Sequence, residues 1–515
     1  MTGAAARAPA QVIVGLDIGT TGVKAVAFGL GSPWRTVAIR EYPLLEPEPG
    51  WQVQDPETIM AATADALAEC VAAAGGAEVV AVALSTAMHG LIGLDAGMRP
   101  LTPLITWADA RANAQARELR ASGQAAELHR HTGTPVHSMT PLTKLMWLRR
   151  HAPATLSATS WWVGLKDYLL WRLTGTLATE LSSASATGLL DTAARSWSPA
   201  AAALAGVSLD QLPPILPTTA TLALSPAPAD RVGLRAGTPV VTGAADGPLG
   251  NLGTGAITEG VAGLSLGTSG AIRMVVAEPR VDDAGTLFCY ALTDSAWVIG
   301  GAVSNGGIVI HWAGRALAPD VRGGRGEGPE EALLALAAAV PPGSGGLVML
   351  PYLLAERAPL WDPDLRGAYL GLRRDHTRGH LVRAALEGVC LQLRVVLDQL
   401  DALQPVHSVR ATGGAFRSAL WREVMAATLD RPLQAVGAAE GTALGAAALG
   451  LIALARAAQL GEAVAQLSPP SADEPPPIVA DRNLVAAYDR LRASVPELIR
   501  SLVPVADLFA RGSSS

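Results

Sequence analysis

The stretch LDIGTTGVKAV (Leu16–Val26) aligns without a gap with LSLGTSGAIRM (Leu264–Met274). In both copies an apolar segment runs into a Gly-Thr-Thr/Ser-Gly turn, and a second extended segment follows. This pattern is typical of two short strands joined by a tight hairpin. The copies lie about half a chain apart, which is much further than the period of a solenoid. The repeat therefore predicts two related domains.

The composition is that of a large, well-buried protein. The chain has 515 residues, of which 50% are hydrophobic and 16% charged, with a formal net charge of −6. The length favours two or more domains, and the low charge excludes a disordered chain. Without a dense basic block we expect no nucleic-acid partner. Three widely spaced cysteines, Cys70, Cys289 and Cys390, indicate a reducing compartment rather than a disulfide framework or metal site.

No targeting pattern stands out in the sequence. The first ten residues lack the apolar core of a signal peptide, and the uncharged stretch 441–455 is shorter than the roughly 20 residues that span a bilayer. We therefore expect a cytoplasmic protein with no membrane partner, in which 441–455 is a buried, closely packed helix.

Apolar strands alternate with alanine-rich helices along the chain, which predicts an α/β fold. Asp55 and Pro56 predict the start of a helix that runs through Val71. Strands are expected within 75–86, 346–353 and 407–414, and further helices over 380–400, 418–429 and 484–502. Two segments rich in Gly, Pro and charge, 315–331 and 469–477, are predicted to be loops.

The two Gly-Thr turns are candidates for phosphate binding. Glycines let backbone N–H groups approach phosphate, and hydroxyls add donors. One such turn is a weak signal, but two matched copies can hold a nucleotide tail between them. Asp17 stands where the second copy has Ser265. A carboxylate beside a polyphosphate needs a cation, so Asp17 is interpreted as a Mg²⁺ partner, with turn capping as the alternative. Lys24 either neutralises phosphate or is a solvated strand residue.

Asp246 is a candidate general base. It lies in PVVTGAADGPLGNLGTGA, where an apolar strand runs into a glycine-rich stretch shortly before the second hairpin. A carboxylate there can accept the proton of an attacking hydroxyl during phosphoryl transfer. An Asp-Gly pair by itself usually marks a turn, and only its place at the junction of the two halves favours a catalytic role.

Five candidates for contacts with a polyol each follow an apolar strand: Met88, His89, Trp107, Asp109 and Arg111. Polyols are bound by polar side chains together with an aromatic face. His137 and Lys144 follow in TPVHSMTPLTKLMW, where a cation would suit an anionic substrate. Further along, the turn at 413–414 before a helix that starts near Ser418 suits the approach of a planar base to the backbone.

Together these motifs resemble the FGGY carbohydrate kinases of the actin-like ATPase superfamily, from about Val12 to Ala455. The segment GAYLGLRRDHTRGHLVRAALEG (367–388) is similar to the second signature of that family. The resemblance implies two ribonuclease-H-like domains flanking a catalytic cleft, with ATP and Mg²⁺ as cofactors. We expect a first domain over 1–253 with the sugar site and first phosphate hairpin, a nucleotide-binding domain over 254–460, and a linker with a C-terminal helix over 461–515.

The resemblance also implies roles for individual residues. Asp246 falls on the catalytic base, and Met88 and His89 match substrate contacts of xylulose kinases. The implied nucleotide contacts are Thr20, Thr21, Gly22, Lys24, Thr268, Gly307, His311, Gly414 and Ser418. His311 stands where relatives often have Gln. Gly441, after Glu440, stands where they usually carry a small residue with a side chain. The segment 315–331 does not resemble the family.

Within the family, strings such as MHGLIGLD, TGTPVHSMTPLTKLMWLR and LLAERAPLWDPDLRGAYLGL are most similar to gluconate kinases. This implies phosphorylation of D-gluconate to 6-phosphogluconate. A kinase for xylulose or another polyol is the nearest alternative, and a nucleotide-dependent sugar sensor is an alternative from another class. The expected partner is a small-molecule substrate, and a homodimer is compatible with the sequence.

Overall fold

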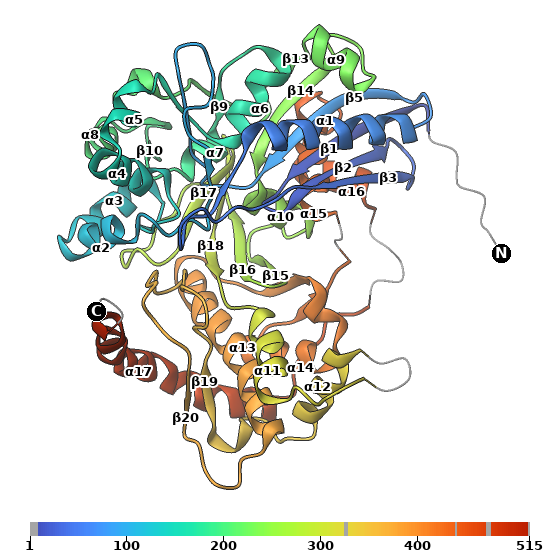
Figure 1. Ribbon diagram of the computed structural model, residues 1–515. Helices are drawn as coiled ribbons and strands as arrows, with labels where there is room; N and C mark the ends of the chain where they lie inside the picture. The colour runs from blue at the N-terminus through green and yellow to red at the C-terminus, as the bar shows by residue number, and fades with distance from the viewer. Residues whose placement is uncertain (1–8, 324–327, 438–439, 470–474, 513–515) are drawn as a thin grey trace. The chain divides into compact units, whose positions relative to one another are not determined.

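The computed structural model describes residues 9–323, 328–437, 440–469 and 475–512. The chain divides into two compact units (Figure 1): unit 1 contains Met1–Ile257, Val275–Ile299 and Glu440–Ala472, and unit 2 contains Thr258–Met274, Gly300–Ala439 and Asp473–Ser515. The expected boundaries near 253 and 460 treat each domain as nearly continuous in sequence. In the structure, two later segments instead return to unit 1.

Unit 1 is built on a six-stranded sheet (Figure 1) with the strand order β13-β14-β5-β1-β2-β3. These strands are β13 (Thr221–Ala223), β14 (Pro239–Ala245), β5 (Glu78–Thr86), β1 (Gln11–Ile18), β2 (Gly22–Gly29) and β3 (Arg35–Glu41). The strands β1, β5 and β14 are mutually parallel, whereas β1 and β2 form the antiparallel hairpin that the sequence predicts. The expected strand within 75–86 is confirmed as β5.

The predicted helix after Asp55 is α1 (Pro56–Ala73), which packs against β2 and β3. The Asp55 side chain accepts hydrogen bonds from the N–H groups of Glu57 and Thr58, so it caps the helix as expected. Its inward face contributes Ile59 and Leu67 to the core of unit 1. The structure thus confirms both the start of this helix and its burial.

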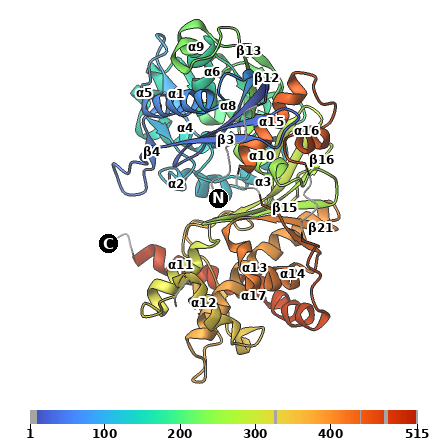
Figure 2. The ribbon, with the colours of Figure 1, turned by 90° about the vertical axis from the view of Figure 1, so that its right-hand side faces the viewer.

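The stretch predicted as a buried, closely packed helix is α15 (Gly441–Ala453), which lies beside α10 (Asp246–Gly253) and against β1 and β5 (Figure 2). A Cβ at Gly15 of β1 would lie 2.0 Å from the Ala443 carbonyl oxygen, and one at Gly253 would lie 1.9 Å from that of Gly441. Only glycine permits these approaches. Small residues therefore let α15 reach both the sheet and α10.

Besides α16 (Leu460–Leu467), which packs against α15, unit 1 contains short elements around the polar segments that follow β5. Their bounds are β4 (Val53–Gln54), β6 (Ile92–Leu94), β7 (Leu104–Ile105), α2 (Asn113–Ala121), α3 (Gln124–Thr132), α4 (Pro141–His151), α5 (Pro153–Ala158), β8 (Trp161–Val163), α6 (Leu165–Thr174), β9 (Thr179–Glu180), α7 (Leu181–Ser185), β10 (Leu190–Asp191), β11 (Ser196–Trp197), α8 (Pro199–Ala205), β12 (Ile215–Leu216), α9 (Pro226–Val232) and β17 (Phe288–Thr293). A separate apolar cluster, including Leu91, Leu145 and Trp162, holds this region together.

Unit 2 contains the second predicted hairpin, β15 (Val261–Leu266) with most of β16 (Gly270–Val276), as an antiparallel pair. β21 (Ser408–Thr412) lies parallel to β15 and to β22 (Leu433–Ala435). Of the stretch expected as a strand at 346–353, only β19 (Val348–Leu350) forms, paired with β20 (Ala368–Leu370). Pro351 ends it because proline has no N–H for the ladder.

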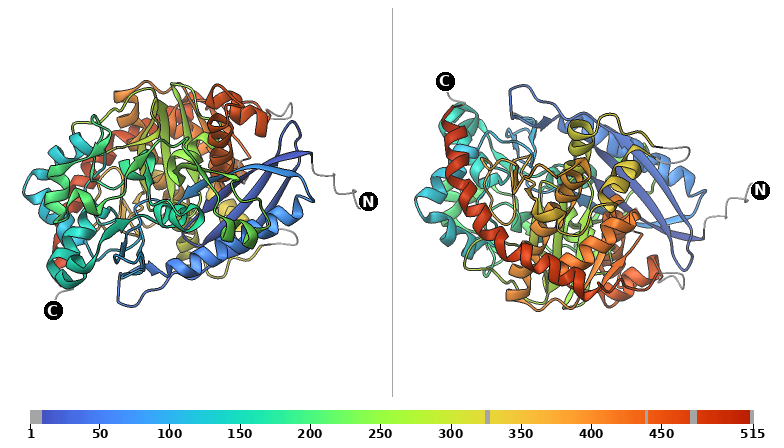
Figure 3. Two further views of the ribbon diagram at one scale, coloured as in Figure 1. Left: turned by 90° about the horizontal axis from the view of Figure 1, so that it is seen from above. Right: turned by 90° about the horizontal axis from the view of Figure 1, so that it is seen from below.

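Helices of unit 2 confirm the predicted positions: α13 (Arg378–Leu403), α14 (Ala419–Leu429) and the long C-terminal α17 (Arg482–Gly512), which Figure 3 shows as one continuous helix. The loop expected at 315–331 is shorter than predicted, because α11 (Ile308–Leu317) and α12 (Pro329–Ala338) extend into it. Of that stretch, 324–327 lie outside the described residues, as do 470–474 of the second predicted loop.

No helix in the described ranges combines the length and the apolar character needed to cross a membrane. The three cysteines are buried and free. Burial raises the thiol pKa of Cys70 and of Cys289 to about 12, which keeps them protonated near neutral pH.

Candidate functional site

The polar residues of unit 1 gather where three parallel strands end. Asp17 near the end of β1 is paired with Ser85 in β5, and the last residue of β14, Ala245, is paired with Thr86. Because the carboxyl ends of parallel strands meet at one edge of a sheet, the residues that follow these strands also meet there. Asp246 directly follows β14, and Met88 and His89 follow β5, so the structure brings the predicted base, metal and substrate residues to one edge.

Asp17 is held by two hydroxyl groups. Its Oδ1 accepts a hydrogen bond from Ser85 Oγ at 3.1 Å, and its Oδ2 accepts one from Thr442 Oγ1 at the start of α15. Burial raises the pKa of Asp17, while the two hydroxyls and the nearby Lys24 ammonium oppose the shift. Lys24 is its cross-strand partner in the hairpin. A buried carboxylate with one hydroxyl donor on each oxygen keeps lone pairs for a hard cation or its water.

The turn of the first hairpin is fixed by side chains that the sequence analysis missed. Tyr42 Oη donates to the Gly19 carbonyl at 2.5 Å, and Gln54 Nε2 donates to the Thr20 carbonyl at 2.7 Å. Trp107 Nε1 donates to Thr20 Oγ1 at 2.8 Å, so this predicted substrate residue contacts the hairpin directly. Tyr42 and Gln54 belong to no motif, and their role depends on how the chain folds back.

Gly22 and Thr21 complete this turn. A Cβ at Gly22 would lie 2.6 Å from the Arg40 carbonyl oxygen, so β3 leaves room for glycine only. Thr21 is exposed. The hairpin therefore presents Thr21 outward from a turn whose backbone is anchored from three sides.

Asp246 is the first residue of α10 and is half-buried. Its Oδ1 accepts a hydrogen bond from the Gly247 N–H at 2.8 Å, and the N–H of the preceding Ala245 donates to Ser182 Oγ at 3.2 Å. Ser182, which the sequence analysis did not single out, thus fixes the end of β14. A carboxylate at a helix N-terminus is stabilised in its ionised form, as a proton acceptor must be before reaction.

His89 has a left-handed backbone, with φ of +63°, a conformation that non-glycine residues adopt at a cost. Its Nδ1 lies 2.7 Å from the Ala186 carbonyl oxygen, and its ring meets the edge of Tyr290 in β17 with centroids 5.8 Å apart. Because a carbonyl only accepts, Nδ1 carries the proton, and Nε2 of the neutral ring is an acceptor. The backbone and ring of this predicted substrate residue are therefore both fixed.

Lys144 in α4 is fully buried, and its Nζ donates to the carbonyls of His89 at 2.6 Å and Ile105 at 3.2 Å. Burial lowers its pKa to about 7, with a smaller opposing effect from Asp109 and a reinforcing one from Arg111. Direct contact with a substrate would require these bonds to break. The geometry favours a role in positioning His89 over the expected contact with an anionic substrate.

Asp109 and Arg111 form a buried, two-pronged ion pair. Arg111 Nε and Nη2 donate to the two Asp109 carboxylate oxygens at 2.8 Å each, and the guanidinium lies over the Trp51 ring at 3.8 Å. The Gln52 N–H donates to the same carboxylate. His137 is also buried, and its Nδ1 accepts from the Met139 N–H at 3.2 Å. These interactions organise the segment around Trp107 and favour a structural role for the pair.

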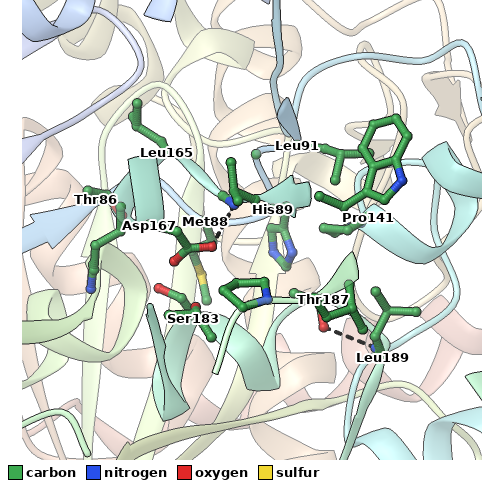
Figure 4. A pocket seen from close by; sticks show the side chains of 18 of the residues that line it. Thr86, Met88, His89, Leu91, Pro141, Leu165, Asp167, Ser183, Thr187 and Leu189 are labelled. Carbon is green, nitrogen blue, oxygen red and sulfur yellow. Dashed lines mark hydrogen bonds between the residues drawn. The ribbon is translucent and has the colours of Figure 1, made fainter. Parts of the chain in front are cut away.

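Met88 and His89 are among the residues that line a cavity of about 40 Å³ (Figure 4). Asp167 and Ser183 line it, and Asp167 Oδ2 accepts from the Gly164 N–H at 2.7 Å. Burial raises the pKa of Asp167 to about 6. This volume holds a few water molecules rather than a six-carbon substrate. The cavity is therefore too small to be the sugar site itself, although Met88 and His89 line it.

In unit 2, three glycine-bearing segments meet at the second hairpin. The Gly306 N–H donates to the Thr268 carbonyl at 3.1 Å, and the Gly307 N–H donates to the Gly267 carbonyl at 2.7 Å. A Cβ at Gly413 would lie 2.1 Å from the Leu266 carbonyl oxygen. The predicted nucleotide residues Thr268, Gly307 and Gly414 are thus close neighbours, and Ser418 caps α14 by accepting from the Trp421 N–H.

His311 is on α11, four residues after Gly307, and its imidazole is largely exposed. It lines a hollow of about 530 Å³ with Arg315, Arg322 and Leu333, a volume in the range of small-molecule sites. Part of this wall, Ala318, Pro319, Val321 and Arg322, comes from the segment 315–331. That segment therefore shapes the surroundings of a predicted nucleotide residue.

Within the described ranges, no group of three or more His, Cys, Asp or Glu side chains is arranged to hold a metal ion. A Mg²⁺ ion bound through one carboxylate and substrate phosphates needs no such cluster. The surroundings of Asp17 fit that mode of binding.

Comparisons with known proteins agree with this arrangement. Residues 12–253 match the N-terminal domain of the FGGY family of carbohydrate kinases, and residues 262–454 match its C-terminal domain. The gluconokinase of Bacillus subtilis is 38% identical over 86% of this chain and 87% of its own length. The xylulose kinase of the same organism is 30% identical over 85% and 87%, respectively. The crystal structure of gluconate kinase from Lactobacillus acidophilus has a TM-score of 0.90 and 31% identity, covering 97% of this chain and 99% of that one.

These matches cover well over half of the chain in sequence and almost all of it in fold. The protein belongs to the FGGY family of carbohydrate kinases, and it has their two-domain, actin-like ATPase fold. It is a sugar kinase whose sequence is most similar, among these relatives, to gluconokinase.

Proposed function

We propose that this kinase transfers the γ-phosphoryl group of ATP to D-gluconate and yields 6-phosphogluconate and ADP. The observation that carries the proposal is the higher identity to the gluconokinase than to the xylulose kinase of one organism, 38% against 30%, over nearly the same share of the chain. Both relatives come from one organism, so the difference in identity does not arise from comparing different species.

Asp246 is the proposed general base. The substrate hydroxyl oxygen forms a bond to the γ-phosphorus, the bond from that phosphorus to the bridging oxygen of ADP breaks, and the hydroxyl proton passes to the Asp246 carboxylate. Its place at the start of α10 supports this role, because the helix dipole and the Gly247 N–H favour the ionised form. The bond from Ala245 to Ser182 limits its movement.

Asp17 is the proposed partner of Mg²⁺, directly or through a water molecule. The ion, when bound with ATP, neutralises charge on the phosphate oxygens. Ser85 and Thr442 orient the Asp17 carboxylate near the turn of the first hairpin, where it can meet the ion. The raised pKa of Asp17 supports the assignment, since a cation would restore the charge that burial disfavours.

The proposed nucleotide contacts come from both hairpins. Thr20, Thr21, Gly22 and Lys24 of unit 1 and Thr268 of unit 2 are assigned to phosphates. Gly307 and His311 of unit 2 are assigned to the nucleotide without a finer role, and Gly414 and Ser418 to its adenosine part. The bonds from Gly306 and Gly307 to the second turn support a backbone cradle there. His311 also lines a hollow of about 530 Å³, a volume in the range of small-molecule sites, which Gly307, Gly414 and Ser418 do not line.

Met88, His89 and Trp107 are the proposed direct contacts of the sugar acid. His89 Nε2 accepts from a substrate hydroxyl, because Nδ1 is engaged by Ala186. Asp109 and Lys144 support these contacts from behind, through Arg111 and through the His89 carbonyl. Asp109 and Lys144 thus remain part of the proposed site, but they do not contact the substrate directly.

The second candidate is a xylulose kinase, which the 30% identity over 85% of the chain supports. The test is ADP release with Mg-ATP against gluconate, xylulose, glycerol and ribulose. Selective turnover of gluconate supports the proposal, whereas preference for xylulose replaces it within the same family. Tight binding of a sugar with negligible ADP release would favour a sensor instead.

A further inference from the structure

The edge strand β3 carries a pattern of exposed residues that the kinase reaction does not use. It is the outermost strand of the unit 1 sheet, and on its free side the described residues place no further strand. Its odd-numbered side chains from 35 to 41 are exposed, and its even-numbered ones are buried or half-buried. Val37 is 39% exposed and Ile39 52%. Apolar residues on an open edge strand are unusual, because such edges tend to pair with another chain.

The backbone of β3 is available for pairing. The Tyr42 N–H donates to the Thr21 carbonyl, and the Trp34 carbonyl accepts from the Gly29 N–H. Even-numbered residues therefore direct their peptide groups toward β2, and the odd-numbered residues direct theirs to the free side. An added antiparallel strand would find four residues with outward N–H and C=O groups.

The sequence of β3, RTVAIRE, is complementary to itself in antiparallel order. When two copies pair about a two-fold axis through Ala38, Arg35 of one copy lies opposite Glu41 of the other. In the same register Val37 lies opposite Ile39. Each pair occurs twice by symmetry, and all four pairs are on the exposed face. Opposite charges and β-branched residues directly across two strands are favourable cross-strand pairs.

We propose that β3 is the interface of a homodimer in which two unit 1 sheets join edge to edge. The occupant is a second copy of this chain. When the two-fold axis passes through Ala38, opposite charges face each other and apolar residues face each other in the same register. The pairing supplies about eight main-chain hydrogen bonds, two for each facing pair of outward residues. The inference is independent of the proposed substrate.

Two contacts within one copy compete with this pairing. Arg40 Nη1 donates to the Ile39 carbonyl at 2.8 Å, and Arg35 lies 3.7 Å from Glu440. Both arginine side chains are substantially exposed, and ion pairs at the surface contribute little. Arg40 also forms an ion pair with Glu69 on α1, and it can keep this ion pair when it releases the Ile39 carbonyl. Neither contact blocks the edge.

The test is the dimer dissociation constant of the full chain, measured by sedimentation velocity and light scattering over a wide concentration range. Arg35→Glu places two like-charged pairs at the interface, and so does Glu41→Arg. Each should raise the dissociation constant about tenfold, whereas the double variant Arg35→Glu/Glu41→Arg restores both attractive pairs and the wild-type value. Added salt should weaken the wild-type dimer.

Ile39→Lys should also shift the chain to monomer. Leu209→Lys is the matched control, because Leu209 is 40% exposed, lies in unit 1 and is outside the sheet. Circular dichroism establishes that each variant is folded, and the double variant tests the interface even where a single change reduces stability. A chain that is monomeric at every concentration overturns the proposal. So does a dimer that keeps its dissociation constant in Ile39→Lys and both single charge variants, or an edge occupied only by another protein.

Discussion

The two Gly-Thr hairpins share a sequence pattern but differ in register and in charge. In the first, Ile18 pairs with Val23, so the turn contains residues 19–22. In the second, Leu266 pairs with Gly270, so the turn contains only residues 267–269. The first turn is closed by a bond from the Gly19 N–H to the Gly22 carbonyl, and the second by one from the Gly267 N–H to Ser269.

Their surroundings explain the difference. The first turn is held by side chains, those of Trp107 and Tyr42 among them, and has the carboxylate of Asp17 beside it. The second is held by backbone N–H groups of Gly306 and Gly307, and Ser265 replaces the carboxylate. Changes near the first hairpin should therefore affect turnover and metal dependence, whereas changes near the second should affect nucleotide affinity.

The largest effect is expected from Asp246→Asn, which keeps the shape of the side chain but removes the proton acceptor. Turnover should fall about 10²–10⁴-fold. ATP affinity should stay close to wild type, because Asp246 is not among the proposed nucleotide contacts. Steady-state kinetics and calorimetric titration of nucleotide measure the two quantities. Near-normal turnover in this variant would show that Asp246 is not the general base.

Asp17→Asn tests the charge that separates the hairpins, with Ser265→Ala as the matched change in the second. Loss of the carboxylate should raise the Mg²⁺ concentration needed for the half-maximal rate about 10–100-fold. Ser265→Ala should leave this concentration unchanged. A titration of the rate with Mg²⁺ measures this. Equal effects of the two variants would contradict the assignment of metal binding to the first hairpin.

The same variant has a pH signature in stability. Burial raises the pKa of Asp17 in the folded protein above that of the unfolded chain. Its favourable contribution is present below the unfolded pKa and is lost as pH rises through the folded pKa. Asn has no such titration. The stability of Asp17→Asn relative to wild type should therefore increase with pH across this window, as urea denaturation at several pH values would measure. A constant difference contradicts the shift.

Gly307→Ala tests the backbone cradle at the second hairpin. The new Cβ would lie 2.8 Å from the Gly267 carbonyl oxygen, so the turn must move and lose its bond to the Gly307 N–H. The KM for ATP should rise about tenfold, a change of about 1.4 kcal/mol in binding free energy, because the displaced turn presents its backbone and Thr268 less well to the nucleotide. The Mg²⁺ dependence should be retained. Gly328→Ala is the control, because a Cβ there meets open space. An unchanged KM would exclude the cradle.

Lys144→Met should have the smallest effect on rate and a measurable one on stability. Removing the ammonium leaves the His89 and Ile105 carbonyls without this donor, at a cost of about 1–3 kcal/mol. The KM for the sugar should rise with little change in kcat, because His89 is positioned less well. If Lys144 instead contacts an anionic substrate, the loss of affinity would be confined to anionic sugars in the substrate panel.

Lys144 also gives a pH signature of opposite sign. Its pKa is about 7 in the folded protein and near 10.4 in an unfolded chain. The unfolded chain therefore binds more protons between these values, and wild-type stability should rise relative to Lys144→Met as pH increases from about 7 toward 10. Parallel denaturation curves of both proteins measure the difference. No change across this range would mean that the buried amine keeps its ordinary pKa.

Local patterns predicted much of the fold. Asp55 and Pro56 marked the start of α1, and Ser418 marked that of α14, because capping depends on neighbours in sequence. The ungapped repeat predicted both hairpins, whereas their different registers could not be read from it. Register depends on what holds each turn, and Gly306 and Trp107 lie far from those turns in the sequence.

The candidate site shows the same division. Residue type and position beside strands singled out Asp17, His89 and Asp246. The same reasoning could not separate contact from support, because Lys144 and Asp109 carry charges that suit a substrate but are buried with protein partners. Ser182, Tyr42 and Gln54 carry no local signal, since each reaches the site only through long-range packing.

The sequence by itself determined the two related halves, the alternation of strands and helices, the family and the main chemical candidates. These follow from apolar periodicity, glycine turns and capping, which act over a few residues. Only the tertiary structure decided which segments return to unit 1, which charges are buried, and which strand is left with an open, self-complementary edge. Those outcomes depend on contacts between residues distant in sequence, where packing and desolvation outweigh local preference.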